Sequence, residues 1–405
     1  MSLAASVLQP RGVRRSVFSA FCAVLIGIGL ARFAYTPLVP ALIIEGWFSP
    51  AEAGYLGAVN FVGYLAGGGA AHRLATYIGA TLALRLMMLF ATVSFFTCAL
   101  PVSFLWFFIW RFISGLAGGV LMVLAASAVL PLVAPEKRGS TGGLIFTSVG
   151  IGIMAAGTVV PLMLRLGLQE TWLALGVVAL IGTLAAWGGW PASRKQAFVQ
   201  HQVRPAGMIA DSSGLTPVLI AYALIALGLI PHMVFLVDYV VRGLNSGIGA
   251  GNLYWVLFGF GALFGPICAG WIGDHIGFRS ALTAVLAIET LAIGLPAISG
   301  HPIPLAVSSL LVGAFVPGVV PLVLGRLHEL FKLDDARRKA WGRATMAFAA
   351  GQAGGGFLFS FIFSQTNGSY PLLFGLGAVI FAIAVVIVMT STPRSFVPAD
   401  EASPS

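Results

Sequence analysis

The feature that most constrains this chain is a series of twelve long apolar runs whose basic residues gather in alternate connections. A helix needs roughly 20 apolar residues to cross about 30 Å of hydrocarbon, and each run is near that length. In lipid the backbone must satisfy its own hydrogen bonds, which favours helices over open sheets. Of the 22 Lys and Arg residues, all but four lie in alternate connections or in the two terminal segments. The sequence therefore predicts an all-α, polytopic membrane protein with 12 transmembrane helices.

The charge asymmetry also predicts an orientation. Arg165 and Arg242 are the basic residues on the poorer side, while Arg32 and Arg111 fall inside apolar runs. Basic connections stay in the cytoplasm, and an even number of crossings puts both termini there. We expect an integral protein of the bacterial inner membrane. The first run, about residues 17–44, is too long for a cleaved signal peptide and is interpreted as a retained signal anchor.

Composition excludes several other classes. Hydrophobic residues make up 59% of the 405-residue chain and charged residues only 9%, against about 25% charged in soluble domains. The net charge of +9 resides in short loops beside the membrane, where anionic lipid accounts for it. No nucleic acid partner is expected. Three cysteines within apolar runs lack metal-ligand spacing, so no metal and no cofactor is expected.

The apolar runs divide the chain into two halves. We expect residues 1–190 to form an N-terminal six-helix bundle and residues 216–392 a C-terminal one. A cytoplasmic linker at 191–215 joins them, and a disordered cytoplasmic tail follows at 393–405. The predicted spans are 17–44, 51–72, 80–100, 103–131, 140–166, 171–190, 216–241, 251–272, 280–298, 303–325, 342–364 and 370–392.

The two halves share a sequence pattern. With an offset of about 198 residues, Gly115 meets Gly313, and the glycine-rich stretch 150–157 meets 351–356. A parallel repeat of six helices places the binding site of a transporter between its halves. The sequence thus predicts two pseudo-symmetric bundles.

A motif between the eighth and ninth spans carries a family resemblance. Gly270, Asp274, Gly277 and Arg279 lie in the string Gly-Trp-Ile-Gly-Asp-His-Ile-Gly-Phe-Arg. This resembles the signature loop of the major facilitator superfamily, except that His275 stands where Arg is usual. The resemblance implies a gate in which Asp274 binds helix N-termini or basic groups across the interface of the halves when the transporter is outward-facing, with glycines allowing close backbone approach. The matching first-half segment has no Asp.

Arg111 in the fourth span is the next candidate. It precedes Gly115 and Gly119, which resembles the fourth-helix motif of the same superfamily, where the Arg faces the cavity and is implicated in proton coupling. The alternative is a plain packing stripe. That alternative suits the glycines but not Arg111, because a charge near the bilayer centre costs several kcal/mol, about 3 on insertion scales.

Arg32 and Tyr35 lie in the first span, in a string ending Tyr-Thr-Pro-Leu-Val-Pro. The string resembles the YbfB/YjiJ-like permeases, a branch of the superfamily. The resemblance implies that spans one, four, seven and ten line the cavity, so Arg32 and Arg111 would form a cationic centre there. The alternative is that Arg32 is buried against a carboxylate such as Asp238 or Glu289.

The seventh span contributes His232 and Asp238. Asp238 precedes Arg242 by four residues, so an ion pair at the outer helix end competes evenly with a cavity role. His232 follows Pro231 and either titrates in the physiological range or bonds a carbonyl that the proline frees.

Glu289 and Gln352 complete the candidates. Glu289 lies in the middle of the ninth span, where an unpaired charge would be costly; we interpret it as a candidate proton carrier, although this span is usually peripheral in the superfamily. Gln352 lies among glycines, where helix backbones come close, and is a candidate for solute binding or coupling. An interhelical hydrogen bond is the simpler explanation for any one amide.

The function that fits these residues is secondary transport of a small solute by alternating access, coupled to protons. No nucleotide-binding loop is present, and no clustered catalytic residues suggest an enzyme. The glycine-rich fifth span resembles the antiporter motif and favours export. Two cavity arginines favour uptake of a small organic anion instead, and a receptor without flux is a further alternative. We expect a monomer whose other partners are protons and membrane lipid.

Overall fold

The computed structural model describes residues 10–134, 137–191, 214–331 and 333–391, and every regular element in these ranges is helical. The predicted linker and tail fall almost wholly outside them. In chain order the elements are α1 (Pro10–Val24), η1 (Leu25–Leu30), α2 (Tyr35–Ile44), α3 (Pro50–Ile78), α4 (Ala80–Cys98), α5 (Phe104–Val129), η2 (Leu130–Leu132), α6 (Arg138–Met163), α7 (Leu168–Ala186), α8 (Leu215–Gly228), η4 (Pro231–Phe235), α9 (Leu236–Asp238), η5 (Tyr239–Gly243), α10 (Gly247–Ile276), α11 (Phe278–Ile298), α12 (Pro302–Leu330), α13 (Asp334–Gln365) and α14 (Tyr370–Thr390).

The predicted spans coincide with these helices. Among the described residues, eleven helical segments are long and apolar enough to cross a membrane. The remaining predicted span is α3, which is 29 residues long but rich in glycine. Helix α13 begins well before the predicted 342–364, because its first turns are charged and extend beyond the apolar run.

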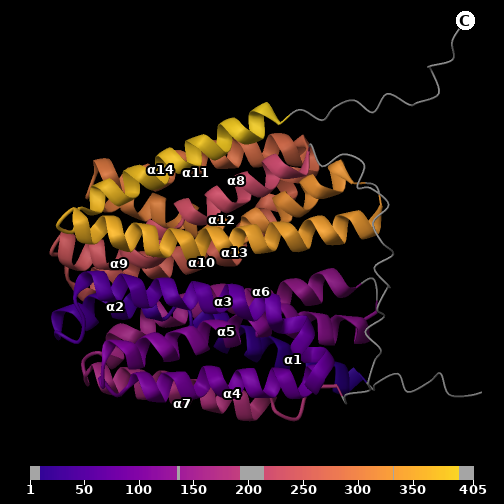
Figure 1. Ribbon diagram of the computed structural model, residues 1–405, viewed down its shortest axis with the longest axis horizontal. Helices are drawn as coiled ribbons and strands as arrows, with labels where there is room; N and C mark the ends of the chain where they lie inside the picture. Colours follow the sequence, from indigo (N-terminus) through magenta and orange to yellow (C-terminus); the bar gives the residue numbers. More distant parts are fainter. Residues whose placement is uncertain (1–9, 135–136, 192–213, 332, 392–405) are drawn as a thin grey trace, which may run out of the picture.

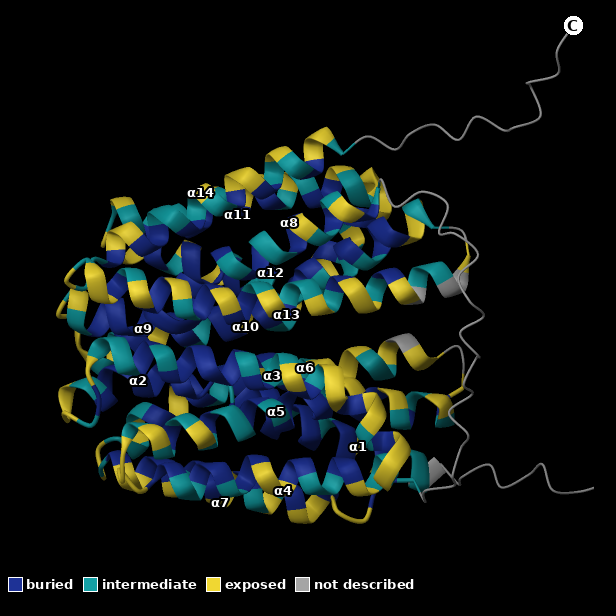
Figure 2. Cartoon of the chain, in the orientation of Figure 1, coloured by how far each residue is buried: buried dark blue, intermediate teal, exposed yellow. Residues whose placement is uncertain are grey.

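The elements gather into two groups. Figure 1 shows α1–α7 together in the lower part of the view and α8–α14 together above them. We call the end where α1 begins and α14 ends the terminus end, and the opposite end the loop end. Buried residues concentrate inside and between the groups, and exposed ones line the outer faces (Figure 2).

Glycines repeat the same helix pairing in both groups. A side chain added at Gly115 of α5 would strike the backbone of Asn60 in α3, and one at Gly313 of α12 would strike Phe258 in α10. Each member of the second pair lies 198 residues after its counterpart in the first. Gly79 and Gly277, separated by the same interval, have nearly equal backbone angles, φ 84° and ψ 144° against φ 81° and ψ 147°. The sequence offset is thus matched by repeated geometry.

The first and seventh spans are the interrupted ones. The first comprises α1, the π-helix η1, a turn at 31–34 and α2; the seventh comprises α8, the π-helix η4, α9 and the π-helix η5. Pro231 begins η4 and lacks the backbone N–H that a regular helix needs. Such π-helical turns are frequent at functional sites, and here they place irregular backbone in the middle of both spans.

The two groups meet mainly through four helices and the loop-end parts of the interrupted spans. Helix α3 packs against α13, and α6 packs against α10. At the loop end α2 packs against η4 and α9, whereas at the terminus end α1 packs against α5, α6 and α7 of its own group, and α8 against α12, α13 and α14. This conformation is therefore closed at the loop end.

Candidate functional site

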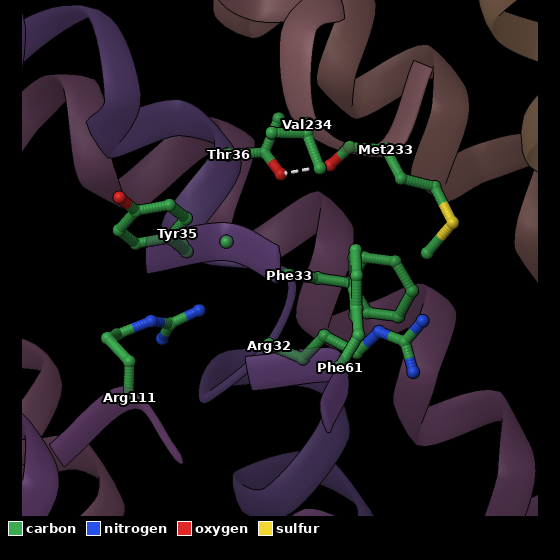
Figure 3. A pocket seen from close by; sticks show the side chains of 9 residues that line it. Arg32, Phe33, Tyr35, Thr36, Phe61, Arg111, Met233 and Val234 are labelled. Atoms are coloured by element: carbon green, nitrogen blue, oxygen red, sulfur yellow. Dashed lines mark hydrogen bonds between the residues drawn. The ribbon is translucent and has the colours of Figure 1, made fainter. Parts of the chain in front are cut away.

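A small cavity lies where the interrupted first span meets α5, α3 and η4. Its volume is about 10 Å³, and residues of both groups line it (Figure 3): Arg32, Phe33, Tyr35, Thr36, Gly57, Phe61, Arg111, Met233 and Val234. A cavity of this size holds about one water. Spans one, four and seven thus meet at this cavity and α3 takes part in addition, whereas span ten, which the resemblance also implied, contributes none of the described lining residues. A solute would need these helices to move apart.

Arg111 is buried beside the cavity, with only 3% of its surface exposed. Its Nη1 donates to the Ala31 carbonyl at 2.7 Å, and its Nε donates to the Leu56 carbonyl at 3.4 Å. The guanidinium carbon lies 4.1 Å from the centre of the Tyr35 ring. Backbone carbonyls and an aromatic face therefore hold this charge, partly through the turn that interrupts the first span.

Arg32 occupies the other side of the cavity (Figure 3). Its Nη2 donates to the Gln352 Oε1 at 2.7 Å, a bond that joins the first span to α13 in the second half. The rings of Phe33, Phe61 and Tyr64 surround the guanidinium, with centroids 5.3, 4.7 and 5.0 Å away. Its Nε is buried and has no hydrogen-bond partner in the described part of the chain. The alternative that Arg32 is buried against Asp238 or Glu289 is wrong.

Neither cavity arginine forms a salt bridge among the described residues; Asp238 is paired with Arg242, and Glu329 with Arg326. Placing two cations in a desolvated interior is costly unless opposite charge accompanies them. The planar guanidinium binds carboxylate and phosphate groups in a bidentate manner. The cavity thus has the chemistry of an anion site.

Thr36 and Met233 connect the halves across the cavity, and sequence reasoning missed both. The Thr36 hydroxyl donates to the Met233 carbonyl at 2.5 Å, as the dashed line in Figure 3 marks. The Met233 Sδ in turn accepts from the Gln352 Nε2 at 3.5 Å. The signal available in the sequence was Pro231, which begins the π-helix η4 that contains Met233. The Tyr35 hydroxyl, in contrast, bonds within the first half: it donates to the Ala53 carbonyl at 2.8 Å.

His232 turns away from the cavity. Its Nε2 lies 2.7 Å from the Ser308 hydroxyl, which donates to the Ala292 carbonyl at 2.6 Å. A hydroxyl has one proton to donate, so Ser308 accepts from the histidine, and the Nε2 carries the hydrogen. The Nδ1 is then a bare, buried acceptor without a partner in the described residues. Of the two alternatives for His232, the bond to a backbone carbonyl is wrong, because the Ser308 hydroxyl takes that place.

Asp238 forms an ion pair, as the sequence alternative proposed, but the pair is not an exposed one. Arg242 donates to both Asp238 oxygens, at 2.6 and 2.7 Å, and Tyr370 donates to the same carboxylate at 2.6 Å. Asp238 is 1% exposed. Arg242 and Tyr370 also border a larger cavity of about 400 Å³ at the loop end, between the halves. The cluster joins α9, η5 and α14 at the loop end, and none of its three residues lines the small cavity.

Glu289 is buried in α11, with 3% of its surface exposed, and its Oε2 has no hydrogen-bond partner among the described residues. It belongs to the second half alone, away from both arginines. The sequence placed it in a peripheral span, and its burial comes from the packing of α11 on α12 and α14.

The motif begins in the last turns of α10, which ends at Ile276, and forms a tight turn at Gly277 before α11. This turn lies at the terminus end. Gly277 has a positive φ of 81°, which favours glycine. The turn is held by a residue that the sequence analysis did not select: Glu329 of α12 accepts from the Phe278 N–H at 2.8 Å and from Arg326 at 2.9 Å. Arg279 donates to the Met389 carbonyl at 2.7 Å.

Two motif residues, Gly270 and Asp274, make no close contact with the other described helices in this conformation. Among the described residues, no atom of another element lies within 4 Å of a side chain added at Gly270, so close backbone approach does not explain this glycine in this conformation. Asp274 is exposed and makes no hydrogen bond or ion pair with another described residue. An exposed Asp274 remains available for a partner in another conformation.

Comparison with known proteins agrees with this geometry. Residues 24–389 match the family described as Uncharacterised MFS-type transporter YbfB. Among solved structures, a point mutant of the nucleoside transporter NupG is 12% identical with a TM-score of 0.77, covering 94% of this chain and 100% of that one. A D-xylose-proton symporter is 16% identical with a TM-score of 0.75, covering 93% and 97%.

The xylose transporter XylE from E. coli, in a partially occluded inward open conformation, is 14% identical with a TM-score of 0.73 and covers 94% and 100%. No curated protein matches significantly. Identities this low establish the fold and leave substrates open. The chain, an integral membrane protein and a transporter rather than an enzyme, belongs to the YbfB-like family of the major facilitator superfamily.

Proposed function

We propose that this protein is a secondary transporter that binds a small organic anion between Arg32 and Arg111. The observation that carries the proposal is the pair of guanidinium groups at one cavity, neither of them neutralised by a carboxylate in the described part of the chain. A carboxylate solute would supply the missing charge and could bind either guanidinium in a bidentate manner. The aromatic rings around Arg32 would contact the apolar part of the solute.

Transport would proceed by alternating access between two six-helix bundles, residues 1–190 and 216–392, joined by the linker 191–215 and followed by the tail 393–405. The bonds from Thr36 to Met233 and from Arg32 to Gln352 cross between these halves, so they would break and re-form as the halves rock. With both termini in the cytoplasm of a bacterial cell, the present conformation is closed towards the outside. A monomer surrounded by lipid suffices for this cycle.

We propose proton coupling on separate grounds. An anion that enters with its own charge must move against a negative membrane potential, and a proton carried with it offsets that cost, about 2.3 kcal/mol per charge at 100 mV. Glu289 and His232 are the buried titratable groups of the second half that form no ion pair among the described residues. Glu289 is available to hold a proton without carrying a charge, whereas a protonated His232 would be a buried cation with no compensating charge.

The two functions that the sequence suggested, export and uptake of a small organic anion, differ in the direction of transport. The glycines that suggested export are used for packing: side chains added at Gly150 or Gly157 would strike α10, and one at Gly152 would strike Gly29. We therefore favour proton-coupled uptake of the anion over export. Inside-out and right-side-out vesicles under an imposed pH gradient distinguish the two, since only the coupled direction accumulates solute against its gradient.

The binding proposal is tested by a thermal-stability screen of the purified protein in detergent, with small mono- and dicarboxylates, sugars and amphiphilic cations. A ligand at 100 times its Kd adds about 2.7 kcal/mol to stability. We expect carboxylates to stabilise the wild type and the control Arg165→Ala, whose arginine is exposed. The stabilisation should disappear in Arg32→Ala and Arg111→Ala.

Stabilisation by sugars or cations alone would contradict the anion site. Wild-type transport rates in both arginine variants would contradict the roles of these residues. Binding of a carboxylate without any flux in vesicles would favour the receptor alternative.

A further inference from the structure

We propose that Glu289 holds the coupled proton and that Ser308 and His232 transmit its protonation state to the anion cavity. The inference rests on the proposed function and deepens it, because it assigns the proton to a site in the second half that is separate from the arginines. It also identifies Ser308 as a positioning residue.

The proton site itself follows from burial and satisfaction of hydrogen bonds. Glu289 is 3% exposed, and its Oε2 is buried without a partner in the described residues. An ionised carboxylate in such surroundings would be costly, whereas a protonated one carries no charge. Protonation adds one H⁺ to a carboxylate oxygen and removes one negative charge; the proton comes from water on one side of the membrane and returns to water on the other.

A continuous series of contacts leads from α11 towards the cavity. Ala292 follows Glu289 by three residues, so both lie on one face of α11. The Ala292 carbonyl accepts from Ser308, and Ser308 accepts from His232. A displacement of α11 on protonation would therefore move the His232 side chain.

The next residue connects this series to the arginine cavity. Met233 directly follows His232 in η4, and its carbonyl accepts from Thr36 of the first half. Its Sδ accepts from Gln352, which also accepts from Arg32. The π-helical η4 thus has the proton site on one side and the contacts between the halves on the other.

Other charged groups near η4 are already engaged or lie at the ends of the helices. Asp238 and Arg242 pair with each other and with Tyr370, and Glu52 caps α3 at the loop end. Towards the terminus end the elements that pack on η4 or reach it through Ser308 carry His72, Arg73, Arg279, Arg326, His328 and Glu329. Glu289 is the acidic group that shares a helix face with the Ser308 contact.

The first test asks where the proton is held, and it requires no solute. Infrared spectra of the full-length protein in detergent, titrated with acid and base, show the carbonyl stretch of protonated carboxyl groups. We expect a band that disappears in Glu289→Gln and persists in the control Glu329→Gln, whose carboxylate is ion-paired at the terminus end. Should Glu289→Gln not fold, Glu289→Asp must shift the band or its titration midpoint. A band unchanged by the Glu289 substitution overturns the proposal.

The second test asks whether Ser308 transmits the protonation state of Glu289 to the contacts between the halves. Spin labels at Glu45 after α2 and Ser246 after η5, both exposed, report the distance between the halves at the loop end. In the wild type, acid should favour the closed state by up to about tenfold per pH unit for one coupled proton, and Glu289→Gln should stay closed at every pH.

In Ser308→Ala the loop-end distance should no longer depend on pH, while the infrared band of the Glu289 carboxyl group should still titrate. Ser309→Ala is the matched control, because the Ser309 hydroxyl bonds only the Leu305 carbonyl of its own helix among the described residues. Equal pH dependence in the two serine variants overturns the transmission step. Because neither readout involves an anion, both can succeed even where the anion assignment fails, and the two failures remain distinguishable.

Discussion

At the scale of single residues, this protein differs from a soluble domain in how it holds its buried charges. Asp238 is satisfied fully, by two bonds from Arg242 and one from Tyr370. Arg111 is satisfied by carbonyls and a ring, and Arg32 retains a buried N–H without a partner among the described residues. Fully satisfied charges stabilise a structure, whereas incompletely satisfied ones are available to a ligand.

The Asp238 cluster gives a stability prediction. Asp238→Asn should lower the free energy of unfolding by about 3 kcal/mol, at the low end of the range for breaking a buried pair because Arg242 is partly exposed. Tyr370→Phe removes the hydroxyl that donates to Asp238 and accepts from Arg242, and it should cost about 1.5–3 kcal/mol, the range for a hydrogen bond to a charged group. Thermal unfolding in detergent measures both. Equal unfolding midpoints for Asp238→Asn and the wild type would show that the pair contributes nothing.

At the scale of helices, glycine sets how closely the repeated pairs approach. In α3 the adjacent residues Gly67 and Gly68 differ sharply: a side chain at Gly67 would strike the Leu116 backbone of α5, while one at Gly68 would meet nothing within 4 Å among the described residues. The α10–α12 pair repeats the arrangement at Gly265 against Ala314. Backbone contact in both pairs is what small residues permit in membrane helices.

This difference between neighbours is directly testable. Gly67→Ala should destabilise the protein by about 1–3 kcal/mol through overpacking. Gly68→Ala should be neutral or stabilise by up to about 1 kcal/mol, since alanine favours helix. The melting temperatures of the two variants in the same detergent decide the matter. A Gly68→Ala variant as unstable as Gly67→Ala would contradict the packing geometry.

At the scale of the whole molecule, conformation depends on a few bonds between the halves at the loop end. Thr36→Val keeps the shape of the side chain and removes the donor to the Met233 carbonyl. The loss of about 1 kcal/mol should shift the ratio of closed to open molecules roughly fivefold. Spin-label distances across the loop end measure the ratio. Thr158→Val is the control, because the Thr158 hydroxyl bonds only its own helix among the described residues, and an equal shift in both variants would exclude a gating role for Thr36.

For Asp274 at the terminus end, in contrast to Thr36, we expect a substitution to leave the present conformation undisturbed. Asp274 is exposed and has no bond to the other half among the described residues in this conformation, so Asp274→Asn should leave its stability and the solute Kd unchanged. If Asp274 closes the terminus end when the halves rock, the transport rate should fall while affinity stays the same. Transport and binding assays on one preparation separate these effects. Equal losses of rate and affinity would argue against a gate.

Several features of the molecule were predictable from sequence because they depend on local or periodic chemistry. The apolar runs predicted the helices, since lipid tolerates little else. The positive φ of Gly277 occurs at the motif turn, and the offset of the two halves recurs in the Gly115 and Gly313 contacts. The charges within spans identified Arg32, Arg111 and Asp238 as exceptional, because each is expensive in lipid wherever it lies.

The sequence by itself therefore determined where the apolar helices run and which charges within the spans require a partner. Only the tertiary structure decided which partner each one has: Gln352 for Arg32, Ser308 for His232, and Arg242 with Tyr370 for Asp238. These partners are up to 320 residues apart in the chain. The physical reason is that hydropathy and helical periodicity act along the chain, whereas hydrogen bonds between helices depend on the rotation and depth at which the helices pack.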